Sequence, residues 1–157
     1  MAARVWLAGP PDADSVSVLM AGFRDHIERD RPTDADIRAT VEALLDDPAT
    51  EFLLAAPDGD DVPAGICQLR YRLSVWTATD DCWLEDLFVG DGARGGGLGR
   101  ALIETAFERA RARGCARVQL DVAEDNARAI AVYRAAGFGT EPGAPGRTML
   151  ITRRLDD

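Results

Sequence analysis

The chain has 157 residues and a formal net charge of −9 at pH 7, and 46% of its residues are hydrophobic. This length and hydrophobic content predict a single domain, 1–157, with a sizeable core. The acidity argues against nucleic acid and anionic membranes as partners and fits a cationic substrate, although it would serve solubility equally well. No apolar run approaches a membrane span, and no basic stretch leads into an apolar one at the N-terminus, so we expect a cytoplasmic protein.

The first half of the chain predicts a strand at 5–8, helices at about 12–29 and 33–45, and strands at 51–56 and 62–74. Apolar side chains recur at helical spacing in both helices and mark their buried faces. Thr33 is the expected N-cap of the second helix, and prolines separate the two helices and end the second one.

The second half centres on a strand at 83–89, which is apolar on both faces apart from Glu85 and Asp86 and is therefore expected in the middle of a sheet. A helix is predicted to about residue 113, a strand at 117–122 and a helix at 126–136, with a glycine after each helix. Strands are expected near Phe138 and at 148–155, with a Pro/Gly loop at 141–146 between them. This order predicts a mixed α/β fold.

A glycine-rich loop follows the central strand and reads Arg94-Gly95-Gly96-Gly97-Leu98-Gly99-Arg100. Glycines let another molecule approach the backbone, and the N-terminus of the next helix offers unpaired N–H groups to an anion. The loop lacks the Lys-Ser/Thr pair of a P-loop, and its glycine spacing does not fit the dinucleotide fingerprint. We therefore predict another phosphate or pyrophosphate ligand, the alternative being a flexible surface loop.

Two motifs together resemble the GNAT family of N-acetyltransferases. The first is the Arg-Gly-x-Gly-x-Gly pattern of 94–99, which is similar to that family's acetyl-coenzyme A motif. The second is Asn-x-x-Ala-x-x-x-Tyr-x-x-x-Gly-Phe over 126–138, in which Asn126, Ala129, Ile130 and Tyr133 share one helix face. The resemblance covers residues 83–138 well and the remainder by element order.

The resemblance implies a three-layer fold in which roughly six or seven mostly antiparallel strands are flanked by about four helices, with a splay between the fourth and fifth strands. The donor, acetyl-coenzyme A, would enter this splay by pairing with strand backbone, as in strand addition. No metal is predicted, and Cys67, Cys82 and Cys115 are expected to be reduced and mostly buried. The cofactor-binding residues implied by the motifs are Leu87, Phe88, Val89, Arg94, Gly95, Gly96, Gly97, Leu98, Gly99, Arg100, Asn126 and Tyr133.

The implied chemistry is direct attack of an amine on a thioester. Tyr133 would protonate the leaving thiolate, and Glu85 would accept the amine's proton, directly or through water. Glu85 and Asp86 would also bind the substrate, although adjacent strand residues reach one site together only if the strand contains a bulge, which the resemblance implies. His26, the only histidine, is not favoured as a catalytic residue.

The central strand looks most like that of polyamine and diamine acetyltransferases, so a small cationic amine is the expected acceptor. A protein N-terminus and an aminoglycoside are alternatives, and a catalytically silent acyl-coenzyme A-binding module is an alternative from another class. The resemblance also suggests a homodimer.

Overall fold

The computed structural model describes residues 2–139 and 149–155. The chain divides into two compact units, Met1–Ala123 and Glu124–Asp157, and each is described by itself. Within the described residues, the first unit contains a five-stranded sheet with helices on both faces, and the second contains a single helix. No helix in the described ranges is both long and apolar enough to cross a membrane.

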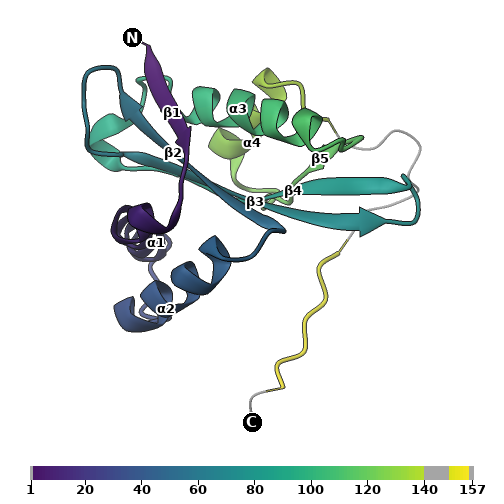
Figure 1. Cartoon of the computed structure of the whole chain (residues 1–157), viewed down its shortest axis with the longest axis horizontal. Coiled ribbons are helices and arrows are strands. Elements are labelled where there is room, and N and C mark those ends of the chain that lie inside the picture. The colour runs from purple at the N-terminus through teal and green to yellow at the C-terminus, as the bar shows by residue number, and fades with distance from the viewer. Residues whose placement is uncertain (1, 140–148, 156–157) are drawn as a thin grey trace. The chain divides into compact units, whose positions relative to one another are not determined.

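The sheet of the first unit has the strand order β1-β2-β3-β4-β5, which is also the order along the chain (Figure 1). The first three strand pairs are antiparallel, whereas β5 pairs with β4 in parallel, through Cys82 with Val118 and Trp83 with Gln119. Beyond Trp83, β4 therefore has an edge that β5 does not cover, which agrees with the predicted splay between the fourth and fifth strands. The strand bounds are β1 (Ala3–Leu7), β2 (Thr50–Pro57), β3 (Gly65–Ser74), β4 (Thr79–Val89) and β5 (Val118–Gln119).

Four α-helices are present in the described residues: α1 (Ala13–His26), α2 (Asp34–Leu45), α3 (Leu98–Ala112) and α4 (Ala127–Ala135). Thr33 caps α2 as predicted, because its hydroxyl accepts a hydrogen bond of 3.2 Å from the N–H of Asp36. Gly114 follows α3 with a φ of 83°, a left-handed conformation that favours glycine at a helix end.

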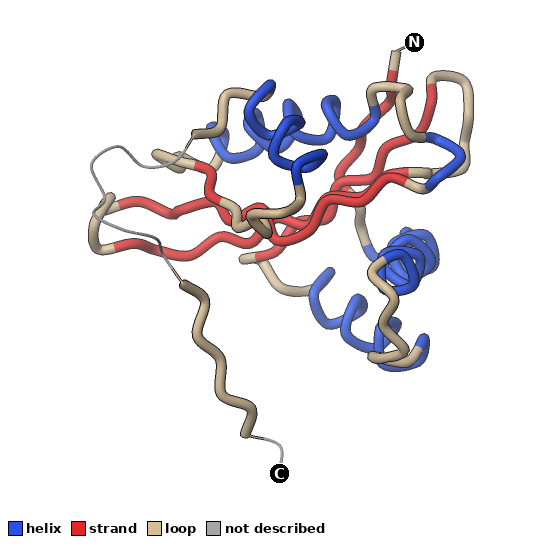
Figure 2. Tube along the Cα trace, turned by 180° about the vertical axis from the view of Figure 1, so that it is seen from behind, coloured by secondary structure: helices blue, strands red, loops and turns tan. Residues whose placement is uncertain are grey.

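Helices α1 and α2 cover one face of the sheet and α3 covers the other, so that the sheet lies between them (Figure 2). Phe52, Ile66 and Phe88 belong to the apolar cluster under α1 and α2. On the other face, a Cβ at Gly65 would lie 3.2 Å from Cδ1 of Leu102, so a glycine there lets α3 pack closely against β3.

A buried polar group joins α3 to the sheet on that face. The carboxylate of Glu51 accepts hydrogen bonds from the Tyr71 hydroxyl and from Nε of Arg109, the latter at 2.9 Å. Burial raises the pKa of Tyr71, which keeps its hydroxyl protonated as a donor. Glu51 is only 9% exposed, and these donors satisfy a charge that would be costly to bury alone.

The last predicted strands are not observed. Residues 138–139 and 149–155 contain no strand, and the expected loop at 141–146 lies outside the described residues. The sheet in the described part therefore has five strands, not the six or seven expected. Met149, Leu150 and Ile151 are 74–86% exposed, and alternating apolar residues form a strand only where a neighbouring strand completes the ladder. The strand expected at 117–122 is likewise only two residues long.

Candidate active site

A β-bulge in β4 places the two predicted substrate-binding carboxylates. Asp86 pairs with Gln68 and Leu84 pairs with Leu69, so Glu85 is an extra residue without a partner on β3. Along a regular strand Glu85 and Asp86 would point to opposite faces. The bulge interrupts that alternation, as the family resemblance implied.

Asp86 lines a cavity of about 320 Å³ on the face of the sheet covered by α1 and α2. Apolar side chains such as Phe23 and Phe52 form much of the wall, and Gln68 adds an amide from β3. The volume lies at the lower end of the range for small-molecule sites, about 300–1,000 Å³. Glu85 is exposed and is not part of the lining, so of the predicted pair it is Asp86 that faces the cavity.

The environment of Asp86 favours its protonated form. Burial, followed by the negative charges of Glu85 and Asp121, raises the pKa of Asp86 to about 6, from 3.8 for an ordinary aspartate. A carboxylate with a pKa near the working pH can both accept and return a proton. Sequence reasoning gave Asp121 no role. It follows β5, the strand beside β4 in the sheet, and only this strand order brings its charge near Asp86.

The uncovered edge of β4 presents backbone groups. Gly90 donates a hydrogen bond of 2.9 Å to the carbonyl of Ala64, so its N–H points to the β3 side. By alternation, Leu87 and Val89 turn their N–H and C=O groups away from β3, whereas Phe88 faces it. The Val89 carbonyl accepts a hydrogen bond of 3.0 Å from Nε of Arg94. The remaining groups of this edge could pair with an extended ligand, as strand addition requires.

The glycine loop has the conformation expected of an anion-binding turn. Gly95 and Gly97 have φ values of 81° and 83°, and Gly97 precedes the first turn of α3. The N–H groups of Gly95 to Gly99 donate no hydrogen bond to any described residue. Unpaired amides at a helix N-terminus attract a phosphate or pyrophosphate, so this loop fits the coenzyme.

The arginines that flank the loop already have protein partners. Arg94 contacts Asp91 at 3.0 Å and the ring of His26 at 3.3 Å, in addition to the Val89 carbonyl. Arg100 pairs with Glu104 at 2.9 Å. An anion at the loop would therefore meet mainly backbone N–H groups, and the ring of His26 is one of three contacts that Arg94 makes.

Two predicted cofactor-binding residues belong to the second unit. Asn126 caps α4, because its side-chain oxygen accepts a hydrogen bond of 3.2 Å from the N–H of Ala129. The ring of Tyr133 packs edge-on against Phe138 with a centroid separation of 5.7 Å. Their roles in coenzyme binding and proton transfer stay predictions.

Sequence reasoning also missed the arginines of the cavity. Arg24, Arg29 and Arg31 line it from the end of α1 and the segment that follows. The cluster of basic residues before Pro32 was a visible signal, but no pattern linked it to the central strand. Within the described part of the chain, no group of three or more His, Cys, Asp or Glu side chains is arranged to hold a metal ion.

Comparison with known proteins agrees with this geometry. The sequence profile of the Acetyltransferase (GNAT) family matches residues 20–138. A mycothiol acetyltransferase from Kineococcus radiotolerans is 38% identical over 140 residues, which cover 88% of this chain and 42% of that protein. A streptothricin acetyltransferase from Streptomyces lavendulae is 39% identical over 87 residues, covering 55% of this chain and 43% of that protein.

Solved structures show the same fold. A crystal structure from Arthrobacter sp. FB24, assigned as an acetyltransferase, has a TM-score of 0.85 and 28% identity, and the match covers 97% of this chain and 96% of that one. The chain spans about two-fifths of the length of the mycothiol acetyltransferases, since the match covers 42% of the one from Kineococcus radiotolerans. The family profile nevertheless extends over most of the chain and includes both predicted motifs. The chain therefore belongs to the GNAT family of acetyltransferases, which are acetyl-coenzyme A-dependent acyltransferases.

Proposed function

We propose that this chain is an N-acetyltransferase that transfers the acetyl group of acetyl-coenzyme A to a primary amine on a small molecule. The observation that carries the proposal is the position of Asp86. It faces a cavity of about 320 Å³ and lies on the strand whose edge β5 leaves uncovered. The acceptor, on the face of the sheet at Asp86, and the donor, along the uncovered edge, would thus meet at one short segment of β4.

The residues of the first unit fit the coenzyme. The N–H groups of Gly95 to Gly99 would hold its pyrophosphate, and the edge groups at Leu87 and Val89 would pair with its amides. The coenzyme supplies the acetyl thioester. A single N-acetyltransferase domain over 1–157 is supported by the family match, which crosses the boundary between the two units at residue 123.

The amine must lose a proton before it can attack. Its pKa is near 10, so roughly one molecule in a thousand is neutral at pH 7. The carboxylates of Asp86 and Glu85 would attract the ammonium form. Asp86 is the better proton acceptor, because it faces the cavity and its pKa is about 6. Glu85, which is exposed on the bulge, would pass the proton to solvent, and Tyr133 would protonate the leaving thiolate.

The named relatives support acetyl transfer more firmly than any one acceptor. Their names refer to mycothiol, streptothricin and, for a protein from Sus scrofa that is 34% identical over 80 residues, thialysine. That match covers 48% of this chain and 46% of the other protein. The cavity volume favours acceptors of about the size of an amino acid over an aminoglycoside or a peptide chain.

A transfer assay tests the proposal. Purified protein is incubated with acetyl-coenzyme A and a panel of monoamines, diamines, amino acids, aminoglycosides and short peptides, and both thiol release and acetylated product are measured. We expect a small amine to be acetylated, and Asp86→Asn to lower kcat by about 10²-fold. Tight coenzyme binding without turnover on any acceptor would instead indicate an acyl-coenzyme A-binding module.

A further inference from the structure

The cavity carries charges of both signs. Three arginines line it, Arg24, Arg29 and Arg31, and Asp86 is the one acidic residue among the described residues of its lining. None of these arginines forms an ion pair with Asp86 in the described part of the chain, and none is among the causes that raise the pKa of Asp86, which are burial, Glu85 and Asp121. The positive and negative groups of the cavity are therefore separated.

Arg24 has a structural role. Its guanidinium contacts Asp25 at 2.9 Å and Asp34 at 2.6 Å, and it donates a hydrogen bond of 2.9 Å to the carbonyl of Pro32. These contacts tie the end of α1 to the start of α2. They neutralise the charge of Arg24 and hold both ends of the short segment that carries the other two arginines.

Arg29 and Arg31 lie on this tied segment. The N–H of Arg29 donates a hydrogen bond of 3.1 Å to the carbonyl of Arg24, and Glu28 before it has a left-handed φ of 58°, which turns the chain sharply after α1. The backbone at this point is thus defined by hydrogen bonds.

Neither Arg29 nor Arg31 has an ion pair or a side-chain hydrogen bond to any residue that the structure describes. The chain contains 27 acidic residues against 18 basic ones, and many of its other arginines are paired with a carboxylate. In so acidic a chain, two arginines at one cavity that pair with no carboxylate of the described residues form a local positive region. Such a region attracts an anion.

We propose that the acceptor amine also carries an anionic group, a carboxylate or a phosphate, which Arg29 and Arg31 bind while its amino group lies at Asp86. This inference rests on the proposed function, because it assigns the two ends of the same acceptor. The planar fork of a guanidinium matches both kinds of anion. A diamine or polyamine would instead bring a second cation to the arginines, so the acceptor class differs from the diamine that the central strand suggested.

Matched acceptor pairs test this assignment by steady-state kinetics. One pair is an amino acid and the amine left by its decarboxylation, and a second is an aminoalkyl phosphate and the corresponding amino alcohol, with a diamine added for comparison. We expect kcat/KM to be at least about tenfold higher for the anionic member of one pair, and that pair identifies the anion. The variant Arg29→Gln/Arg31→Gln should remove this preference through KM and leave the uncharged member within about twofold.

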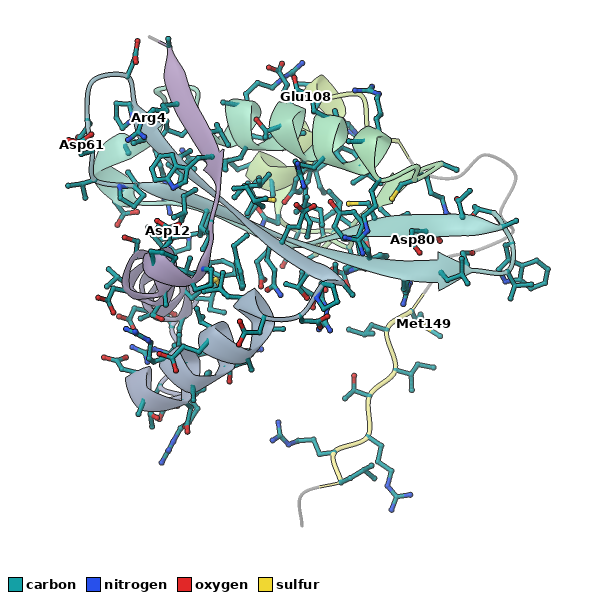
Figure 3. All side chains as sticks on the ribbon, viewed as in Figure 1. Arg4, Asp12, Asp61, Asp80, Glu108 and Met149 are labelled. Carbon is teal, nitrogen blue, oxygen red and sulfur yellow. The ribbon has the colours of Figure 1, made fainter. Side chains whose placement is uncertain are left out.

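Arg4→Gln is the matched control. Arg4 lies on β1, at the other edge of the sheet from β5 (Figure 3), where it is 3.7 Å from Asp61. It is not among the residues that line the cavity. Arg4→Gln removes one positive charge, as each substitution of the double variant does, and should leave kcat/KM for both members of each pair unchanged. Equal rates for the two members, a preference for the diamine, or an equal loss for both members in the double variant would overturn the inference.

A binding measurement separates this inference from the proposed function. Calorimetry with an N-acetylated amino acid, an N-acetylated aminoalkyl phosphate and an N-acetylated uncharged amine requires no turnover. If no amine is acetylated, the proposed function fails. The anion site still stands if either anionic compound binds wild type at least about tenfold more tightly than the double variant. Equal binding of both anionic compounds to the two proteins would refute it.

Discussion

Replacing Asp86 by asparagine should stabilise the folded protein at pH 8 and have little effect on its stability near pH 3.5. The reason is the pKa of this carboxyl group, which is raised from 3.8 to about 6 in the folded state. Between these values the folded state holds a proton that the unfolded chain releases, so the free energy of unfolding falls as the pH rises through this window. Above pH 6 the full cost of ionising Asp86 is present, and the neutral amide of asparagine does not incur it.

The size of the effect follows from the shift. A difference of about two pKa units corresponds to about 3 kcal/mol. Asp86 is only partly buried and faces an open cavity, where solvent screens its charge, so we expect a gain of about 1–2 kcal/mol in the free energy of unfolding at pH 8. A carboxylate retained for catalysis at a cost in stability should, when it is replaced, give a protein that is more stable and less active.

Urea unfolding of wild type and variant at pH 3.5, 5, 6.5 and 8 measures the difference. Asp81→Asn is the control of opposite sign, because hydrogen bonds from Arg117 lower the pKa of Asp81. That substitution should destabilise the protein at pH 8, and its effect should disappear as the pH falls through the lowered pKa. If Asp86→Asn destabilises the protein at pH 8, or if its effect does not change with pH, the electrostatic account of the cavity is wrong.

Three further predictions concern the coenzyme site, the general acid and the core. Gly97→Ala and Gly114→Ala should lower the free energy of unfolding by similar amounts, because both positions have a φ of 83° and open space around an added Cβ. Only Gly97→Ala should also weaken acetyl-coenzyme A binding, by about tenfold in calorimetry. Tyr133→Phe should lower kcat by about 10²-fold and leave coenzyme affinity nearly intact; turnover within about threefold of wild type would assign the acid role to water. Arg109→Met should lower the free energy of unfolding by about 2–3 kcal/mol, because it leaves the charge of Glu51 with fewer partners. Tyr71→Phe should lower it by only about 1 kcal/mol. Equal decreases for the two variants in urea unfolding would contradict this ranking.

The local elements follow from local sequence. Thr33 caps α2 and Gly114 ends α3, as expected, because a side-chain oxygen at a helix start and a left-handed glycine at its end act within one turn of chain. The glycine-rich loop Arg94–Arg100 predicted an anion-binding turn for the same reason. It also pointed to the GNAT family, which the sequence match shows. The predicted strands at the C-terminus were wrong in the described residues, because apolar alternation indicates a strand only where a partner strand is present.

The candidate acceptor site depended on tertiary structure. Glu85 and Asp86 are adjacent in the sequence, but the bulge that interrupts their alternation is a property of the pairing of β4 with β3. Asp121 raises the pKa of Asp86 only because β5 lies beside β4, and Arg29 and Arg31 line the cavity only because α1 and α2 pack on the same face of the sheet. Sequence patterns report interactions within a few residues. The charges of this cavity, those of its arginines and of Asp86, come from segments more than 50 residues apart in the sequence. These segments lie close together because the apolar faces between them are buried.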